Sequence, residues 1–286
     1  QAGVFHLNIT GGEPALRPDF PEILRLIFAK QFYLSLQTNG TLLDDKTLDL
    51  LVANKNNIKQ IGISLYGAVP GPHEAVTRTP GSFELSRNAA LRLKAAGLPI
   101  LIVSLMTSIN HGEFEAVRDF CSANGLPFQF NTVIIPRDDG DPAPCSLRLT
   151  DEELAHLPKP WETFSENKPI DTAALCPDSP LSAWCSMGHS VCYITSRGDV
   201  RACSVVTEAA GNLRNASFAD IWNGSEFFKR IRSMKVSDLE CSKCEHFPKC
   251  RPCPGLAFLE HGSLTSTPKE ICRITSAFMK RDGEDK

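Results

Sequence analysis

Residues 4–14 read VFHLNITGGEP, a short apolar run followed at once by a polar, glycine-rich loop, and this order decides the fold. It recurs in the first half of the chain, where apolar runs start near Phe32, Gln60, Ile100 and Phe128 with amphipathic segments between them. Alternation of a short strand with a helix at this spacing is typical of βαβ units. The sequence therefore predicts an α/β fold built on a parallel sheet.

The segments between the predicted strands carry helix signals. Five apolar residues after Asp19 fall at i, i+3, i+4, i+7 and i+8 and share one helical face: Phe20, Ile23, Leu24, Ile27 and Phe28. Ser82 can cap a second helix, which Gly97 ends, and a third helix stops before Gly125. We expect the first strand over Val4–Ile9 and these helices as the crossovers between strands.

Polar and glycine motifs fall where the predicted strands end. They are Gly11-Gly12-Glu13-Pro14, Thr38-Asn39-Gly40, Ser64-Leu65-Tyr66-Gly67 and Asn110. The carboxyl ends of parallel strands meet at one edge of the sheet, where α/β proteins bind ligands. The recurrence predicts one site assembled from several loops.

The composition argues against some classes of function. The chain has 286 residues, 42% hydrophobic and 22% charged, with a net charge of −3. These values are ordinary for a globular protein, and no apolar run approaches the roughly 18 residues of a transmembrane helix. A net charge of this sign gives no broad basic surface for nucleic acid. We expect neither a membrane nor a nucleic acid as a partner.

The cysteines are concentrated in the last hundred residues. Of 11 cysteines, eight lie between Cys185 and Cys272. An odd number of cysteines in a long chain without a signal peptide favours metal or cluster ligation in a reducing compartment, the cytoplasm, over disulfides. Among the others, Cys121 lies on an apolar helix face and is expected in the core, while Cys145 and Cys176 are expected to be inert.

The eight clustered cysteines form two sets of four. Their spacing is Cys185-x6-Cys192-x10-Cys203, then Cys241-x2-Cys244-x5-Cys250-x2-Cys253, and finally Cys272. Thiolates suit both zinc and iron–sulfur clusters, so the spacing alone leaves the two open. Gly198 allows a tight hairpin before Cys203. A pair of zinc sites that only staple a small domain is the structural alternative.

The periodicity fades between the two halves, which indicates three parts. Residues 1–135 are expected to form the α/β domain, residues 136–184 a proline-rich linker, and residues 185–286 the cysteine-rich domain. Thr150 and Glu153 fit a capping box, so one short helix is predicted within the linker.

In this order, the motifs resemble those of the radical S-adenosylmethionine (radical SAM) enzymes with a SPASM tail, which include ribosomal-peptide maturases and anaerobic sulfatase maturases. The matching segments are 10–14, 38–43, 64–67 and 77–83, with Cys185, Gly198 and Cys203 and then residues 211–213 and 220–222 in the tail. The resemblance spans nearly the whole chain. It implies a partial (β/α)6 TIM-like barrel that lacks its first strand here, followed by a small SPASM iron–sulfur domain.

The resemblance also implies that a family motif, C-x3-C-x2-C, lies upstream of Gln1. No such triad occurs in residues 1–286. We therefore expect a chain cut at its N-terminus and, as it stands, unable to start the radical reaction.

The resemblance assigns cofactor ligands residue by residue. S-adenosylmethionine is expected at Gly11, Gly12, Glu13, Thr38, Asn39, Ser64 and Arg78. Here the glycines let the backbone approach, Glu13 can accept from an ammonium group, Ser64 can bond a ribose hydroxyl and Arg78 can pair with a carboxylate. The alternatives are a helix-entry role for Glu13, an Asn-Gly turn at Asn39, and a solvated charge at Arg78.

The two [4Fe–4S] clusters that the resemblance implies divide the eight cysteines. The first auxiliary cluster takes Cys185, Cys192, Cys203 and Cys253, and the second takes Cys241, Cys244, Cys250 and Cys272. The family has three residues before its seventh cysteine, whereas only Arg251 and Pro252 separate Cys250 from Cys253. His246 is expected beside the cluster rather than as a ligand.

The implied activity is removal of hydrogen from a peptide or protein substrate by an adenosyl radical, with flavodoxin or ferredoxin as reductant. Within the family, sulfatase maturation is the alternative, but Tyr66 stands where the family usually carries Asp, which favours peptide maturation. A protein with two zinc sites and no catalysis is the alternative of another class. The sequence identifies no catalytic acid or base, no particular substrate and no particular bond formed.

Overall fold

A computed structural model describes residues 3–159, 178–247, 250 and 252–281. Cys176 therefore lies outside the described residues. The chain divides into two compact units. One comprises residues 3–134 and 146–153, the other residues 135–145 and 154–286, and each is described by itself.

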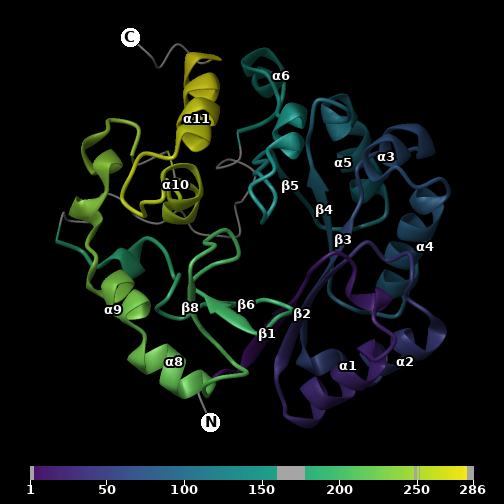
Figure 1. The fold of residues 1–286 in the computed structure, drawn as a ribbon. Coiled ribbons are helices and arrows are strands. Elements are labelled where there is room, and N and C mark those ends of the chain that lie inside the picture. The colour runs from purple at the N-terminus through teal and green to yellow at the C-terminus, as the bar shows by residue number, and fades with distance from the viewer. Residues whose placement is uncertain (1–2, 160–177, 248–249, 251, 282–286) are drawn as a thin grey trace. The chain divides into compact units, whose positions relative to one another are not determined.

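The first unit is built on a five-stranded parallel sheet in the order β1-β2-β3-β4-β5 (Figure 1). Its strands are β1 His6–Ile9, β2 Tyr33–Thr38, β3 Ile58–Ser64, β4 Ile100–Leu105 and β5 Phe128–Asn131. The predicted parallel α/β sheet is confirmed. The prediction that β1 starts at Val4 is wrong by two residues, because Val4 and Phe5 are exposed and the pairing of β1 with β2 starts at His6 and Tyr33.

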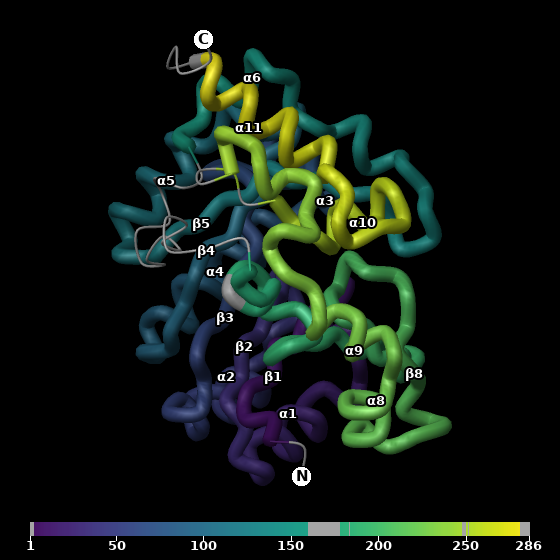
Figure 2. The backbone as a smooth tube through the Cα atoms, turned by 90° about the vertical axis from the view of Figure 1, so that its left-hand side faces the viewer, coloured from purple at the N-terminus to yellow at the C-terminus, as the bar shows by residue number. Residues whose placement is uncertain are grey.

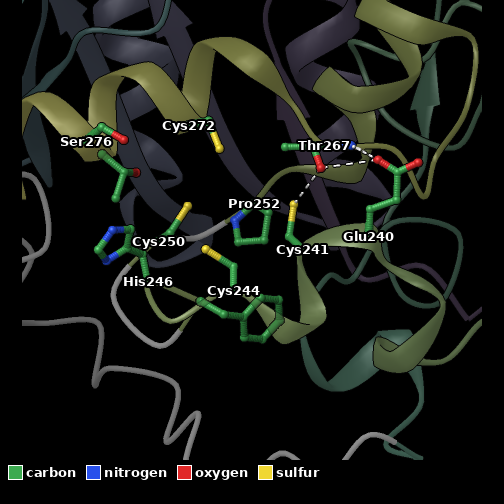
Figure 3. Close-up of a pocket in the computed structure, with 11 residues that line it drawn as sticks. Glu240, Cys241, Cys244, His246, Cys250, Pro252, Thr267, Cys272 and Ser276 are labelled. Carbon is green, nitrogen blue, oxygen red and sulfur yellow. Dashed lines mark hydrogen bonds between the residues drawn. The ribbon is translucent and has the colours of Figure 1, made fainter. Parts of the chain in front are cut away.

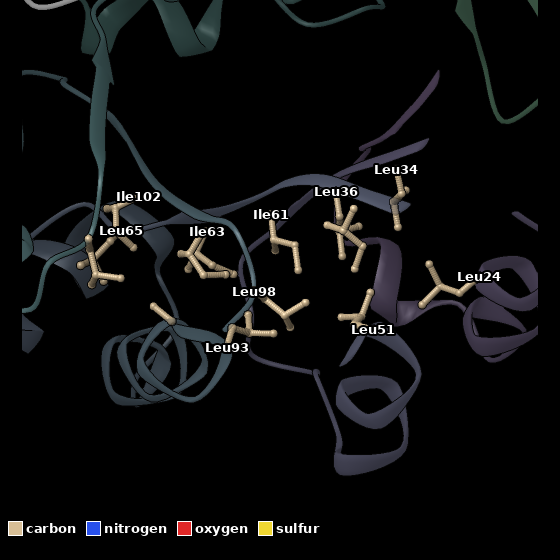
Figure 4. Packing of buried hydrophobic residues seen from close by; sticks show 14 of the residues in the cluster. Leu24, Leu34, Leu36, Leu51, Ile61, Ile63, Leu65, Leu93, Leu98 and Ile102 are labelled. Atoms are coloured by element: carbon tan, nitrogen blue, oxygen red, sulfur yellow. The ribbon is translucent and has the colours of Figure 1, made fainter. Parts of the chain in front are cut away.

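Five helices accompany this sheet. They are α1 Phe20–Ala29, α2 Asp45–Ala53, α3 Pro70–Thr77, α4 Ser82–Ala95 and α5 Phe114–Ala123. Alternate strand residues, Leu36 on β2 and Ile61 and Ile63 on β3, pack with Leu51 and Leu93 of the helices in one buried cluster (Figure 4). This burial removes most apolar side chains of one sheet face from water, the main source of stability for such a layer.

The predicted face of α1 is confirmed, since four of its five apolar residues are buried and Ile23 is half-buried. The predicted cap of α4 is wrong by one residue. The N-cap is Gly81, whose φ of 80° is left-handed, and Ser82 is the first helical residue. Its hydroxyl is buried and lies 2.8 Å from the hydroxyl of Thr77. Gly97 ends the helix with a φ of 74°, as predicted.

Among its described residues, the second unit holds a small antiparallel sheet, four α-helices that follow it along the chain, and several short 3-10 helices. The strands are β6 Tyr193–Ile194, β7 Asp199–Arg201 and β8 Ala209–Asn212, and the helices are α8 Phe218–Gly224, α9 Glu226–Ser233, α10 Pro254–His261 and α11 Lys269–Arg281. Gly198, with a φ of 89°, makes the predicted hairpin between β6 and β7. The helices α10 and α11 follow each other at the C-terminal end of the tube (Figure 2).

The predicted capping box is present. Thr150 N donates to Glu153 Oε2 at 2.7 Å, and Glu153 N donates to Thr150 Oγ1 at 3.2 Å. It starts the short helix α6 Asp151–Ala155. None of the helices in the described ranges is long and apolar enough to cross a membrane.

Candidate functional site

Glu13 connects the loop after β1 to the loop after β2. Its Oε1 accepts from the Ala15 N–H at 3.1 Å and from the Thr38 hydroxyl at 2.6 Å, and its Oε2 accepts from the Asn39 N–H at 2.7 Å. The first bond makes Glu13 the N-cap of a 3-10 helix, Pro14–Leu16, so it does have the helix-entry role considered from the sequence. Oε2 accepts one hydrogen bond and has room for another.

The loop after β2 is a turn closed by side-chain hydrogen bonds. Asn39 Oδ1 accepts from the N–H and the hydroxyl of Thr41, both at 2.8 Å, and Gly40 has a left-handed φ of 77°. The Thr38 hydroxyl accepts from the Gly40 N–H at 3.0 Å. Asn39 and Gly40 therefore form the turn considered from the sequence, and this turn holds the Asn39 N–H toward Glu13.

Of the other predicted cofactor residues, Gly11, Gly12 and Ser64 lie at strand ends, whereas Arg78 lies at the end of a helix. Gly11 and Gly12 are exposed, and a Cβ added at either would meet nothing within 4 Å. Ser64 is the half-buried last residue of β3. Arg78 is exposed and ends α3 in the left-handed region with a φ of 56°, a conformation that costs a non-glycine residue energy.

The structure joins only part of the predicted cofactor set. Hydrogen bonds unite Glu13, Thr38 and Asn39, whereas in the described part of the chain none links them to Ser64 or Arg78. The alternative for Arg78, a solvated charge, agrees with its exposure.

Asn110 orders the loops after β3 and β4. It is buried, its Oδ1 accepts from the N–H and hydroxyl of Thr107 at 2.8 Å, and its Nδ2 donates to the carbonyls of Tyr66 at 2.9 Å and Leu105 at 3.1 Å. The sequence analysis placed Asn110 at a strand end but gave it no partner. All four hydrogen bonds depend on tertiary contacts or on the exact turn, which spacing does not show.

His73 was missed by the sequence analysis. It is buried on α3, and its Nδ1 accepts from the Tyr66 N–H at 3.1 Å, which leaves the proton of the neutral ring on Nε2. Burial lowers the pKa of His73, and Nε2 has no hydrogen-bond partner among the residues that the structure describes. The ring packs against Tyr66 and Phe83. His73 thus fixes the backbone of the Ser64–Gly67 loop.

Gln37 and Gly62 form a close pair on the sheet face opposite the hydrophobic core. The two residues are partners in the β2–β3 ladder, and a Cβ at residue 62 would overlap with the Gln37 carboxamide. Gly62 therefore makes room for this amide, two residues before Ser64. The close approach of Gln37 explains why a glycine occupies this position inside a strand.

The second predicted cysteine set lines one pocket of the second unit. Cys241 lies in a 3-10 helix, Glu240–Lys243, Cys244 directly follows it, and Cys272 is on α11. With Cys250 they surround a cavity of about 200 Å³, and Figure 3 shows the four sulfur atoms directed toward the same space. His246, half-buried, also lines the pocket.

Two thiols of this pocket, those of Cys250 and Cys272, have raised pKa values. Burial is the main cause that raises the pKa of Cys250 to about 11, with Cys272, Cys241 and Cys244 adding to it and the Thr275 hydroxyl opposing it. Burial also raises the pKa of Cys272, helped by Cys241 and Cys244. Four converging thiolates therefore need a cationic centre among them.

The space has room for a metal cluster. A single zinc ion requires four sulfurs about 3.8 Å from one another, from its Zn–S bond length. In the described residues no group of three or more His, Cys, Asp or Glu side chains is arranged to hold one metal ion. The cavity of about 200 Å³ is more than ten times the roughly 10–15 Å³ that a cavity needs to hold one water molecule. Four soft anionic ligands around such a space fit an iron–sulfur cluster.

The first predicted cysteine set is brought together in part. Cys253 is the N-cap of α10, and its pKa is raised mainly by burial and further by Cys203 and Cys185, which are therefore close to it. Trp184 Nε1 donates to the Pro252 carbonyl at 2.8 Å, which holds the neighbours of Cys185 and Cys253 together. Burial alone raises the pKa of Cys192.

Of the remaining cysteines, Cys121 has a structural role. Cys121 is buried on α5, and burial raises its pKa to about 12. This confirms the expected core position. Cys145 is half-buried in a 3-10 helix, Ala143–Leu147.

Comparison with protein families matches both units. The Radical SAM superfamily matches residues 1–121, and SPASM, an iron-sulfur cluster-binding domain, matches residues 185–254. The chain therefore belongs to the radical SAM enzymes that carry a SPASM domain. A non-catalytic zinc protein, the alternative of another class, is not favoured by these matches.

Three relatives share about a quarter of the aligned residues with this chain. The AdoMet-dependent heme synthase of Oleidesulfovibrio alaskensis is 24% identical, over 89% of this chain and 71% of its own. The mycofactocin maturase MftC of Mycobacterium tuberculosis is 28% identical, over 87% and 65%. The PqqA peptide cyclase of Xanthomonas axonopodis is 26% identical, over 85% and 67%.

A solved structure of the same fold is that of anSMEcpe with bound AdoMet and the Kp18Cys peptide. It has a TM-score of 0.71 at 18% identity and covers 98% of this chain and 83% of that one. The similarity confirms the expected TIM-like fold of the radical SAM enzymes.

Proposed function

We propose that this chain binds S-adenosylmethionine and iron–sulfur clusters and serves to modify a peptide with a radical derived from S-adenosylmethionine. The observation that carries the proposal is the convergence of four cysteine sulfurs, from residues 241 to 272, on one pocket. Three of these cysteines lie in the segment that matches SPASM, residues 185–254, and Cys272 follows it. When bound, S-adenosylmethionine supplies the adenosyl radical that removes hydrogen, and the clusters exchange electrons.

The residues at the strand ends would bind S-adenosylmethionine by their polar groups. Glu13 has acceptor capacity left on Oε2 for an ammonium group, and Gly11 and Gly12 leave the backbone open to a ligand. Ser64 would bond the ribose, and Arg78 would pair with the carboxylate. Thr38 and Asn39 support Glu13, since both donate to its carboxylate.

The two cysteine sets would each hold one [4Fe–4S] cluster. Cys241, Cys244, Cys250 and Cys272 would hold the second auxiliary cluster, and Cys185, Cys192, Cys203 and Cys253 the first. With four thiolates each, both clusters would be fully coordinated and suited to electron transfer. A flavodoxin or ferredoxin would supply electrons, and such oxygen-labile centres fit the cytoplasm.

A peptide substrate is supported by the peptide cyclase and the maturase among the relatives. The heme synthases are a second candidate class, because they are 24–25% identical over 87–90% of the chain. The sequence analysis did not consider this class. Tyr66, whose backbone is held by His73 and Asn110, departs from the sulfatase-maturase pattern and supports peptide maturation.

Two measurements on the chain purified without oxygen test the proposal. Metal analysis is expected to give about eight irons with matching sulfide, whereas two zincs without sulfide would refute the cluster assignment. Titration with haem then separates the two candidate functions. We expect no saturable shift of the haem absorption. A stoichiometric shift would indicate that the substrate is a tetrapyrrole and not a peptide.

A further inference from the structure

A carboxylate and a hydroxyl form a relay to one cysteine of the pocket. The Cys241 thiol donates to Thr267 Oγ1 at 3.6 Å, and Thr267 Oγ1 donates to Glu240 Oε2 at 3.2 Å (Figure 3). All three residues line the cavity. The relay connects a surface carboxylate to a sulfur that the proposed function makes a cluster ligand.

Glu240 is fixed in place by neutral donors. Its Oε2 also accepts from the Thr267 N–H at 2.9 Å, and its Oε1 accepts from the Ser266 hydroxyl at 3.5 Å. Its own N–H donates to the Thr265 carbonyl at 2.9 Å. Within the described residues no cation pairs with this carboxylate, so its negative charge stays uncompensated next to the pocket.

Ligation changes what the relay can do. A cysteine bound to iron has lost its proton, so its sulfur can only accept hydrogen bonds. The carboxylate of Glu240 and the sulfur of Cys241 then compete for the single proton of the Thr267 hydroxyl. A carboxylate is the stronger acceptor, and the structure shows the hydroxyl donating to it.

Hydrogen bonds to the sulfurs of a cluster, and the charge around it, set its reduction potential. Reduction adds negative charge, so a hydrogen bond donated to sulfur favours the reduced cluster and a nearby carboxylate disfavours it. We propose that Glu240, by holding the hydroxyl of Thr267 away from Cys241, keeps the reduction potential of the second auxiliary cluster low. This inference rests on the proposed function, and Glu240 is a positioning residue in it.

The test is a redox titration of the reconstituted chain followed by electron paramagnetic resonance. The signal that Cys244→Ala abolishes identifies the second cluster. We expect Glu240→Gln to raise its midpoint potential, with the reduced-to-oxidised ratio at a fixed potential increasing on the order of tenfold, the effect of one hydrogen bond gained. For one electron this is about 59 mV.

Glu245→Gln is the matched control, because it removes the same charge beside Cys244 from a side chain that is 87% exposed and does not contact Thr267. A shift for Glu240→Gln no larger than for Glu245→Gln would overturn the inference. The inference would also be overturned if Glu240→Gln shifted the potential equally in a chain that already carries Thr267→Val, because the Thr267 hydroxyl must transmit the effect. Thr267→Ser should preserve both the native potential and the response.

Glu240→Asp keeps the charge but shortens the side chain, so it should also raise the potential. Glu240→Asp replaces Glu240→Gln in the test if the latter does not retain its cluster. An unchanged potential in Glu240→Asp would then overturn the inference. A native chain that binds no iron at the second site would refute the proposed function as well. A chain with intact clusters and unchanged potentials in the Glu240 variants refutes the inference alone.

Discussion

Glu13→Gln tests whether one carboxylate organises the strand-end loops. Glutamine has the same shape but only one acceptor oxygen, whereas Glu13 uses both of its oxygens for three donors. If the glutamine oxygen faces Ala15 and Thr38, its NH2 group faces the Asn39 N–H, donor against donor. The opposite orientation places the NH2 group against the Ala15 N–H and the Thr38 hydroxyl.

The loss is therefore at least one hydrogen bond to a charged acceptor, worth about 2 kcal/mol. Hydrogen exchange at the Asn39 amide reports it locally and needs no assumption about unfolding of the two units. Exchange of this amide should accelerate about thirtyfold. Glu22→Gln is the control, because Glu22 is 64% exposed and pairs with Arg25 across one turn of α1. Equal exchange rates at Asn39 in both variants would refute the reasoning.

Three further predictions concern packing and burial. Gly62→Ala should lower the free energy of unfolding by less than about 1 kcal/mol in urea titrations, because its Cβ meets only the flexible end of the Gln37 side chain, which can move aside; a loss above about 2 kcal/mol would contradict this account of the pair. Asn110→Ala should cost about 3 kcal/mol in the same assay, since the Tyr66 and Leu105 carbonyls lose a donor; a cost below about 1 kcal/mol would contradict this role. Cys121, whose pKa burial raises to about 12, should resist iodoacetamide at pH 8 until the chain is unfolded; mass spectrometry that finds it alkylated in the native chain would contradict its burial.

Local signals were sufficient for most of the fold. The apolar period of α1, the capping box at Thr150 and Glu153, and the hairpin glycine Gly198 depend on residues close in sequence, and each is confirmed. The cap of α4 was placed one residue late because Gly81 can adopt a left-handed φ that no side chain signals. Element ends are decided by such single residues.

The candidate site was only partly predictable from the sequence. Glycine and acidic residues at strand ends indicate a ligand edge, but the sequence does not show that Glu13 bonds to Thr38 and Asn39, 25 and 26 residues away. His73 carries no motif, and its role comes from contact with the Tyr66 backbone. Thr267 is likewise visible only because the chain folds it against Cys241. These are tertiary contacts, which local periodicity does not contain.

The division of the cysteines into two sites is the central claim, and iron analysis of ligand variants tests it most directly. After anaerobic reconstitution, Cys244→Ala and Cys203→Ala should each retain about four irons per chain, and the double variant almost none. Cys121→Ala should retain the full content, as it lies in the core of the other unit. If either single variant keeps all of its iron or loses all of it, the two-cluster account is contradicted.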